Sequence, residues 1–589
     1  MIKEQLQKIF RQPYNAQTWQ ELLINLFGAS EIRQDPSFLT SDSNEKVEGF
    51  ELGRLHTADR YEIGLFAFEI KQGHNLQLNR VGLRSLVKSY IRYNVDAALV
   101  VYYDATHWRL SFICDLKEQK TAPKRYTYVF GNREESYRTA SAMLVKLSGD
   151  TKPTFKDIKE AFSVEKMSKD FFDGYKARYK EFCAELGATN KSNRDYVKKM
   201  MGRLVFLQFL QKKGWMNGDY NYMQNLFATS PFKEDFLEEV LEPLFFHVLN
   251  TKESERNHPK LKNLGIKINI PYLNGGLFEA DENDKKRVAF DVKLFADLFD
   301  FFSHYNFTID ENDPNDAEVG IDPEMLGHIF ENLLEDNKDK GAFYTPKEIV
   351  QYMCRQSLIE YLQGKLGKHI EIENFINNHD TGNRTDKNNF IAQNAQEIER
   401  LLDCVKVCDP AIGSGAFPMG VLSEIFHAKM ALDMTLDRAA VKKNIIQNSI
   451  YGVDIEQGAV DIARLRFWLS LVVDEDKPQP LPNLDYKIMC GNSLLSRYAL
   501  DIPFEDVFKE YNKGKSASDK MSLERYKQLV ADYTNTSDHT QKADFRNTIE
   551  EIKSAFRTEL SRSEKEKFAK LKGQIADLET PLLLGERTK

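Results

Sequence analysis

The sequence predicts a multidomain protein that combines α/β units with an all-α connector. Three observations predict this fold class. The chain has 589 residues, which is more than one hydrophobic core normally holds. Apolar residues follow alternating strand and helix spacing over 1–150, helical spacing over 151–335, and strand and helix spacing again over 336–500. The charged stretch 501–589 keeps helical spacing with little apolar content, and we interpret it as a solvated helical segment.

The composition excludes several classes of protein. Hydrophobic residues make up 42% and charged residues 29% of the chain, the balance of a soluble globular protein. A net charge of −8 works against a protein that simply coats nucleic acid, although a local basic cleft stays possible. Neither a signal peptide nor an apolar run of transmembrane length is present, and six cysteines in so long a chain do not indicate a disulfide framework. We therefore expect a cytoplasmic protein.

The first 150 residues are expected to form an α/β unit. An amphipathic helix is predicted over 18–28, and a second, over 80–91, follows two strands. The strand that comes next, DAALVVYY, is apolar on both faces, which is typical of a buried central strand. The predicted strands are 49–55, 61–71, 96–103, 109–116 and 125–130.

The middle of the chain is expected to be a helical connector. The segment RLVFLQFLQKKGW (203–215) predicts an apolar helix that ends near Gly214, and PEMLGHIFENLLED (323–336) predicts an amphipathic helix. The Asn-Gly-Gly in PYLNGGLF (271–278) predicts a turn or loop. The polar stretch 365–400 is expected to be a surface excursion.

A glycine-rich turn lies between a short strand and a helix in the third region. It reads Asp409-Pro410-Ala411-Ile412-Gly413-Ser414-Gly415-Ala416-Phe417, and glycines there allow a ligand close to the backbone at a helix N-terminus. A packing turn would look the same, and the dinucleotide and P-loop glycine patterns are absent. A second strand ends at Asp454, where an acidic residue can bind ribose hydroxyls, and a third ends at Asn492.

Four motifs in this region resemble those of adenine-N6 DNA methyltransferases, which bind S-adenosylmethionine. DPAIGSGAF is similar to their first motif, GVDI to the second, CGNSLL to the third, and GAFYTP (341–346) to the motif that packs over the methionine end. The four stand in the family's order. The resemblance implies a Rossmann-like fold whose cofactor-binding residues are Tyr344, Thr345, Pro346, Asp409, Pro410, Gly413, Gly415, Phe417, Asp454, Ile455 and Asn492.

The family's catalytic Asn/Asp-Pro-Pro-Tyr/Phe motif does not occur in this sequence. In the family that motif holds the amino group of a flipped adenine and follows a fourth strand, which pairs with the first. The first strand here, VKVCDP, is therefore expected to keep an unpaired edge. We expect that the chain does not methylate DNA alone, and that it is a fragment of a longer polypeptide or works with a second chain that supplies the rest of the methyltransferase and a target-recognition domain.

A candidate nuclease motif lies on the strand YEIGLFAFEIK. Two acids that hold Mg²⁺ and a lysine beside the attacking water can cleave a phosphodiester, and Asp59, Glu69 and Lys71 are the candidates, with Asp59 and Glu69 as metal ligands. Glu69 and Lys71 share one strand face. Acid-x-Lys recurs elsewhere in the chain, so a salt-bridged solvent-facing strand is the plainer interpretation of the tripeptide alone. The order of predicted elements, however, resembles the PD-(D/E)xK nuclease core, which implies a supporting position for Glu21 on the first helix.

Taken together, the regions resemble type IIG restriction-modification enzymes, in which cleavage and methylation share one polypeptide. The resemblance implies site-specific adenine-N6 methylation and Mg²⁺-dependent cleavage of double-stranded DNA in the cytoplasm of a prokaryotic cell. Two alternatives stay open. One is a phage-defence adenine methyltransferase whose amino-terminal unit does not cleave. The other is a non-catalytic S-adenosylmethionine-binding subunit of a split complex.

Overall fold

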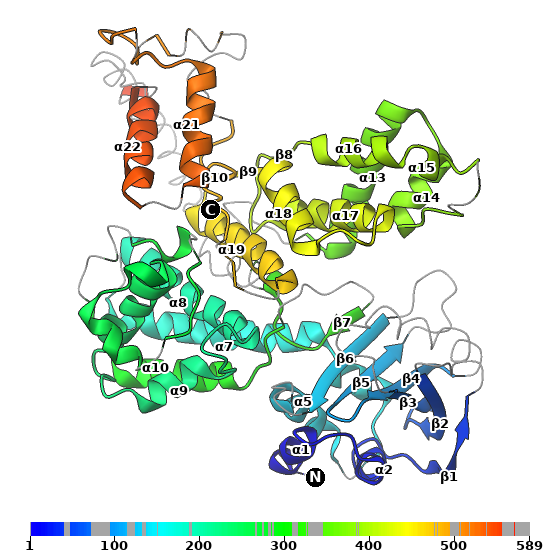
Figure 1. The fold of residues 1–589 in the computed structure, drawn as a ribbon. Helices are drawn as coiled ribbons and strands as arrows, with labels where there is room; N and C mark the ends of the chain where they lie inside the picture. The colour runs from blue at the N-terminus through cyan, green and yellow to red at the C-terminus, as the bar shows by residue number, and fades with distance from the viewer. Residues whose placement is uncertain are drawn as a thin grey trace, which may run out of the picture. The chain divides into compact units, whose positions relative to one another are not determined.

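The chain forms two compact units, Met1–Gly491 and Asn492–Lys589, in a computed structural model (Figure 1). The boundaries expected at 150 and 335 fall inside the first unit, so the division into a nuclease, a connector and a methyltransferase domain stays a prediction. The structure describes all residues except 1, 40–46, 72–94, 115–123, 132–136, 150, 188–190, 266–267, 274–275, 281–283, 285–287, 309–315, 326, 328–344, 384–385, 387, 476–477, 480, 495–502, 504–505, 507, 510, 518, 537–538, 556–569 and 572–589.

A seven-stranded mixed sheet organises the amino-terminal part, and its strands follow one another in chain order. The strands are β1 (Glu31–Phe38), β2 (Val47–His56), β3 (Glu62–Ile70), β4 (Ala97–Tyr103), β5 (His107–Cys114), β6 (Lys124–Gly131) and β7 (Asp316–Glu318). β3 pairs with β4 and β6 pairs with β7 in parallel, whereas the other neighbours are antiparallel. The five predicted strands are confirmed, and the predicted helix 80–91 lies outside the described residues.

The two faces of this sheet belong to different apolar clusters. Helices α1 (Lys3–Phe10), α2 (Ala16–Asn25) and α5 (Tyr137–Leu144) belong with the odd-numbered residues of β4 to the large core. The even-numbered residues of β4 pack with Phe66 and Phe68 of β3 in a smaller cluster. Successive strand side chains point to opposite faces, so β4 is buried on both, as its sequence predicts.

The connector is helical, as predicted, and its described helices pack around many phenylalanine rings. It contains α6 (Phe155–Ala161), α7 (Val164–Glu185), α8 (Lys191–Lys212), α9 (Tyr222–Thr229), α10 (Val292–Ser303) and short 3₁₀ turns that include Gly276–Phe278. Between α9 and α10 the chain forms two π-helical segments, Leu237–Leu241 and Pro243–Leu249. Glu242, the residue between them, has helical backbone angles, so the helix continues through Pro243, which cannot donate a helical hydrogen bond.

A three-stranded parallel sheet in the order β10-β9-β8 lies in the last part of the first unit. Its elements are α13 (Lys347–Leu366), α14 (Ile370–Asn378), α15 (Phe390–Gln393), α16 (Ala395–Cys404), β8 (Val407–Asp409), α17 (Ala416–Leu432), α18 (Arg438–Asn448), β9 (Ile450–Asp454), α19 (Gln457–Asp474) and β10 (Ile488–Cys490). Within the described part of the chain, β9 is the one strand that pairs with β8, and the expected free edge of β8 stays a prediction.

The expectation of a surface excursion over 365–400 is wrong. Residues in this stretch form α14, α15 and part of α16, and Ile372, Phe375 and Ile376 of α14 are fully buried. These apolar residues recur at helical spacing, and the polar residues between them face outward. The average composition of the stretch therefore concealed its helical pattern.

The second unit is helical, as predicted, but it has a small core of its own. Its described helices are α21 (Leu523–Asn535) and α22 (His539–Ala555), which contact each other. Phe508, Met521 and Ile552 are buried together. Among the helices that the structure describes, none has the length and apolar character needed to cross a membrane.

Candidate cofactor and metal sites

The glycine turn at the end of β8 requires residues without a side chain. Gly413 has φ of 53° and Gly415 has φ of 91°, both in the left-handed region that side chains disfavour. A Cβ at Gly415 would also lie 3.2 Å from the Cβ of Ala463 on α19. α17 begins directly after this turn, at Ala416, so the backbone of the turn leads into a helix N-terminus. Such an end offers unpaired N–H groups to a ligand.

Asp454 joins this turn to the end of β9. Its Oδ2 accepts a hydrogen bond from the backbone N–H of Gly413 at 2.8 Å, and its Oδ1 accepts one from the N–H of Glu456 at 2.9 Å. The N–H of Ile412 donates to the carbonyl of Val453 at 3.0 Å. A carboxylate has about four acceptor positions, so Asp454 keeps capacity for the hydroxyls of a ribose.

Another glycine, Gly452 of β9, allows the glycine turn to lie close to β9. A Cβ on Gly452 of β9 would lie 2.2 Å from Cδ1 of Ile412, the buried side chain of the turn. The side chain of Ile412 thus occupies the space that Gly452 leaves free. The glycine turn, Asp409 and Asp454 therefore lie together at the carboxyl ends of parallel strands, which is where open α/β sheets bind ligands.

Two carboxylates make this end of the sheet electronegative. Burial raises the pKa of Asp409, and the nearby charge of Asp454 raises it further, against the effect of a hydrogen bond from the N–H of Ala411. A cation bound at this place would relieve the repulsion between the two carboxylates. S-adenosylmethionine carries both a sulfonium and an ammonium group, so its charge complements this pair.

The structure describes the positions of some of the other predicted cofactor residues but not of all. Thr345 and Pro346 directly precede α13, and α13 packs on α17, where Sγ of Cys354 donates to the carbonyl of Phe417 at 3.5 Å. Ile455 is 66% exposed, directly beside Asp454. Pro410 is exposed in the turn itself. Tyr344 lies outside the described residues, and Asn492 begins the second compact unit, so their proposed contacts with the cofactor stay predictions.

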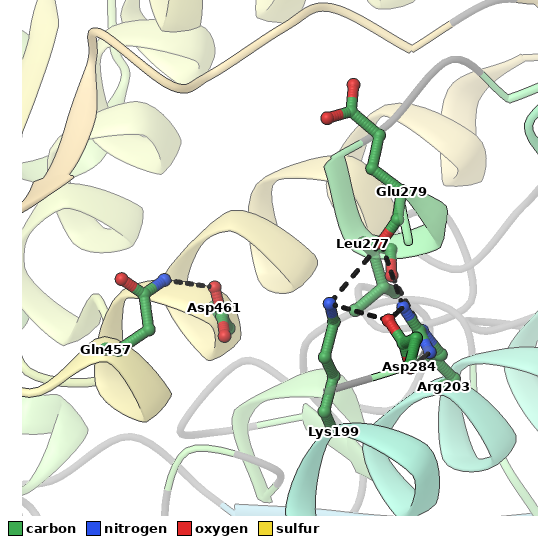
Figure 2. A network of polar contacts seen from close by, with 7 residues as sticks. All are labelled: Lys199, Arg203, Leu277, Glu279, Asp284, Gln457 and Asp461. Atoms are coloured by element: carbon green, nitrogen blue, oxygen red, sulfur yellow. Dashed lines mark hydrogen bonds and ion pairs between the residues drawn. The ribbon is translucent and has the colours of Figure 1, made fainter. Parts of the chain in front are cut away.

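Within the connector, a buried polar network joins α8 to the loop 277–284 (Figure 2). Arg203 of α8, which is 2% exposed, donates to the carbonyls of Leu277 and Glu279 at 2.9 and 3.0 Å and pairs with Asp284 at 2.8 Å. Lys199, one turn earlier, pairs with Asp284 at 3.3 Å. This network fixes the loop that follows the predicted Asn-Gly-Gly turn, and Asn274 and Gly275 of that turn lie outside the described residues.

Asp461 of α19 is also influenced by this network. Burial raises the pKa of Asp461, whereas Arg464, a hydrogen bond from Gln457 and the charges of Lys199 and Arg203 oppose the rise. α19 starts three residues after Asp454, and it contacts α8. The connector and the candidate cofactor site are therefore parts of one packed structure.

At the candidate nuclease site, the register of the β2–β3 hairpin decides which acids meet. Glu69, near the carboxyl end of β3, pairs directly with Glu48 of β2. Directly paired residues point to the same face of a sheet. Nζ of Lys71 lies 2.9 Å from Oε1 of Glu48, and the hydroxyl of Tyr103 on β4 donates to Oε2 of Glu69 at 3.4 Å. Glu48, Glu69, Lys71 and Tyr103 thus form one polar cluster.

The prediction that Asp59 and Glu69 hold one metal ion is wrong. Asp59 lies in the turn before β3, whereas Glu69 lies at the far end of that strand, roughly 20 Å away at about 3.3 Å per residue. The carboxylate of Asp59 accepts hydrogen bonds from Thr57 at 2.6 Å and from the N–H of Phe155 at 2.9 Å, which lower its pKa. Asp59 therefore connects the hairpin turn to the start of α6.

Sequence reasoning missed Glu48, which lies opposite Glu69, where Asp59 was expected. The sequence alone does not bring Glu48 opposite Glu69. The register that pairs His56 with Glu62 would put Glu48 opposite Ile70, and a register shift between Glu51 and Gly53 moves the pairing by one residue. Within the described residues, no group of three or more His, Cys, Asp or Glu side chains could hold a metal ion. A metal here would rest on two carboxylates, which suits Mg²⁺ because it keeps several waters.

Tyrosines line this cluster in place of the predicted Glu21. Burial, together with the charges of Glu69 and Glu48 and the bond to Glu69, raises the pKa of Tyr103 to about 12, so it stays a proton donor. The ring of Tyr14, just before α2, stacks on that of Tyr103 with 4.1 Å between centroids. Glu21 lies exposed on α2, and its supporting position stays a prediction.

Comparison with known proteins finds that the chain is similar to restriction-modification proteins. Residues 448–577 match the family described as Eco57I restriction-modification methylase. This match includes β9 with Asp454 and continues through the charged helical segment beyond residue 500. The resemblance that the sequence motifs indicate is thereby confirmed.

Two curated relatives carry both activities in their names. The chain is 32% identical over 368 residues to a putative type II restriction enzyme and methyltransferase, RM.MjaORFECS2P, of Methanocaldococcus jannaschii, covering 58% of this chain and 31% of the relative. It is 24% identical over 303 residues to the type II restriction enzyme and methyltransferase RM.Eco57I of Escherichia coli, covering 49% of this chain and 28% of the relative. The chain spans less than a third of the length of either relative.

Among solved structures, the chain is similar to the type IIL restriction-modification enzyme MmeI, which was determined in complex with DNA. The TM-score is 0.36 at 18% identity, and the alignment covers 62% of this chain and 46% of MmeI.

Proposed function

We propose that this protein binds S-adenosylmethionine at the carboxyl ends of β8 and β9 and serves adenine-N6 methylation of DNA in a restriction-modification system. One observation carries the proposal: the carboxylate of Asp454 bonds to the N–H of Gly413 at 2.8 Å, which brings the acid and the glycine turn together. The match of residues 448–577 to a restriction-modification methylase family supports the reaction class. Adenine as the target base and double-stranded DNA as the substrate follow from the motif resemblance.

Different residues at this site would contact different parts of the cofactor. Asp454 would accept hydrogen bonds from the ribose hydroxyls, and Asp409 with the turn Gly413–Gly415 would surround the methionine part. The cofactor supplies an activated methyl group on its sulfonium sulfur. The chain's own contribution is to orient this group by the charge of its two carboxylates and by the close backbone of the glycine turn.

We also propose that the cluster of Glu48, Glu69 and Lys71 is the centre of a Mg²⁺-dependent endonuclease. The two carboxylates would hold the metal, and Lys71 would orient the attacking water, while Mg²⁺ would supply Lewis-acid polarisation of the phosphate. The pairing of Glu48 with Glu69 across the hairpin and the names of the relatives support this proposal. A protein whose amino-terminal unit does not cleave remains the alternative, since Lys71 and Glu48 also form an ordinary half-exposed ion pair.

The cofactor proposal is tested by calorimetric titration of the purified chain with S-adenosylmethionine. Asp454→Ala removes the ribose acceptor and the bond to Gly413, so we expect the dissociation constant to rise roughly tenfold or more. Asp437→Asn is the matched control, because Asp437 also accepts a backbone N–H, at the start of α18, and asparagine caps a helix equally well. If the unchanged protein shows no binding heat, the proposal is wrong. It is also wrong if Asp454→Ala binds S-adenosylmethionine with the same dissociation constant as the unchanged protein.

A further inference from the structure

Ser414, the middle residue of the glycine turn, is enclosed from two sides. It is 4% exposed. From α19, the guanidinium of Arg466, which is 3% exposed, donates to the carbonyl of Ser414 at 3.1 Å. On another side lies Gly327, which the sequence places in the predicted helix 323–336 at the end of the connector. A Cβ built on Gly327 would lie 2.6 Å from Oγ and 2.8 Å from Cβ of Ser414.

The connector holds the start of this helical stretch firmly in place. The buried carboxylate of Asp322 accepts the N–H of Met325 at 3.0 Å. Ile321 donates to the carbonyl of Asn306 at 2.7 Å. The hydroxyl of Ser168 on α7 lies 3.2 Å from Sδ of Met325. A side chain added at Gly327 would therefore press on Ser414, because these contacts limit how far the backbone just before Gly327 can move away.

We propose that Gly327 is a positioning residue for the cofactor site: its missing side chain leaves the space in which Ser414 lies, and this sets the course of the turn Gly413–Gly415. The inference rests on the proposed function. Ser414 cannot avoid an added methyl group by rotation, because its Cβ as well as its hydroxyl would be too close. The turn would shift, and with it the N–H of Gly413 that bonds to Asp454. Gly327 thus shapes the candidate cofactor site through its contact with Ser414.

The test compares Gly327→Ala with Gly364→Ala by calorimetric titration with S-adenosylmethionine. Gly364 lies inside α13, and a Cβ there would meet no atom within 4 Å, so it controls for the effect of removing a glycine from a helix. Overpacking at a site without room to relax should weaken binding by Gly327→Ala roughly tenfold or more. Gly364→Ala should bind like the unchanged protein.

A compensating change separates positioning from general damage. Ser414→Gly removes both atoms that clash with the added methyl, so the double variant Gly327→Ala/Ser414→Gly should recover most of the affinity lost by Gly327→Ala, measured against Ser414→Gly alone. A double variant that binds no better than Gly327→Ala, or a Gly327→Ala protein with unchanged affinity, overturns the inference. If the unchanged protein does not bind the cofactor, the proposed function itself fails, which is a distinguishable result.

Discussion

At the scale of single residues, the sequence predicted which residues lie together at the candidate cofactor site better than at the candidate nuclease site. Asp409, Gly413 and Gly415 lie within nine residues of one another, and β9 brings Asp454 to them because it is the next strand along the chain. Asp59 and Glu69 are also close in sequence, but an extended strand separates them. Residues that are close in sequence can therefore be far apart in space when the residues between them form an extended strand. The contact between Gly327 and Ser414 could not be predicted from the sequence, because one glycine in a predicted helix does not indicate which distant residue lies against it.

The revised nuclease site makes a prediction that separates Glu48 from Asp59. In a supercoiled-plasmid nicking assay with Mg²⁺, Glu48→Gln, Glu69→Gln and Lys71→Ala should each lose activity by roughly a hundredfold or more, because each removes a metal ligand or the water-orienting amine. Asp59→Asn should keep activity, although it weakens the contact with the N–H of Phe155 and lowers the thermal midpoint slightly.

The opposite pattern would restore the original assignment. If Asp59→Asn abolishes nicking at unchanged thermal stability while Glu48→Gln nicks normally, the metal is held by Asp59 and not by Glu48. If none of the four variants differs from the unchanged protein, the amino-terminal unit does not cleave DNA at this cluster.

At the scale of elements, apolar alternation located β2 to β6 of the amino-terminal sheet, but it did not predict β1, and it cannot show which distant segments pair. β7 is three residues long and joins the amino-terminal sheet from a distant part of the chain, so no local pattern could assign it. The helices of 365–400 were missed because their apolar residues stand among many polar ones.

Glu242, between the two π-helical segments, makes the stability of the connector depend on pH. Burial, with the charges of Glu238 and Asp284, raises the pKa of Glu242 to about 7, against the opposing charges of Lys260 and Arg203. The folded state therefore keeps a proton that the unfolded state releases near pH 4.5. The contribution of Glu242 is present in full below that pH and is lost as the pH rises through about 7.

Glu242→Gln should remove this dependence. Urea unfolding should show equal stability near pH 4 and a gain of roughly 1–3 kcal/mol over the unchanged protein at pH 8. Glu234→Gln, an exposed change shortly before the first π-helical segment, is the control and should alter neither value. A Glu242→Gln protein with the pH profile of the unchanged protein would show that Glu242 ionises normally.

At the scale of the whole molecule, the chain does not divide into compact units at residues 150 and 335, where its pattern of apolar residues changes. The amino-terminal sheet takes β7 from beyond the connector helices, and Lys213 of the connector donates to the carbonyl of Val473 on α19 at 2.7 Å. Leu481 donates to the carbonyl of Leu273 at 2.8 Å. Such contacts join residues far apart in sequence, so composition could not reveal them. They hold the amino-terminal sheet, the connector and the three-stranded sheet together in the first compact unit.

Hydrogen–deuterium exchange with and without S-adenosylmethionine tests most directly whether the cofactor binds where β8 and β9 end. Bound cofactor should slow exchange of the amides in 409–415 and 452–456, because it covers the turn and orders the bond between Gly413 and Asp454. In Asp454→Ala the same cofactor concentration should give little or no protection. Protection confined to other segments, or equal protection in both proteins, would contradict a cofactor site built on the glycine turn and Asp454.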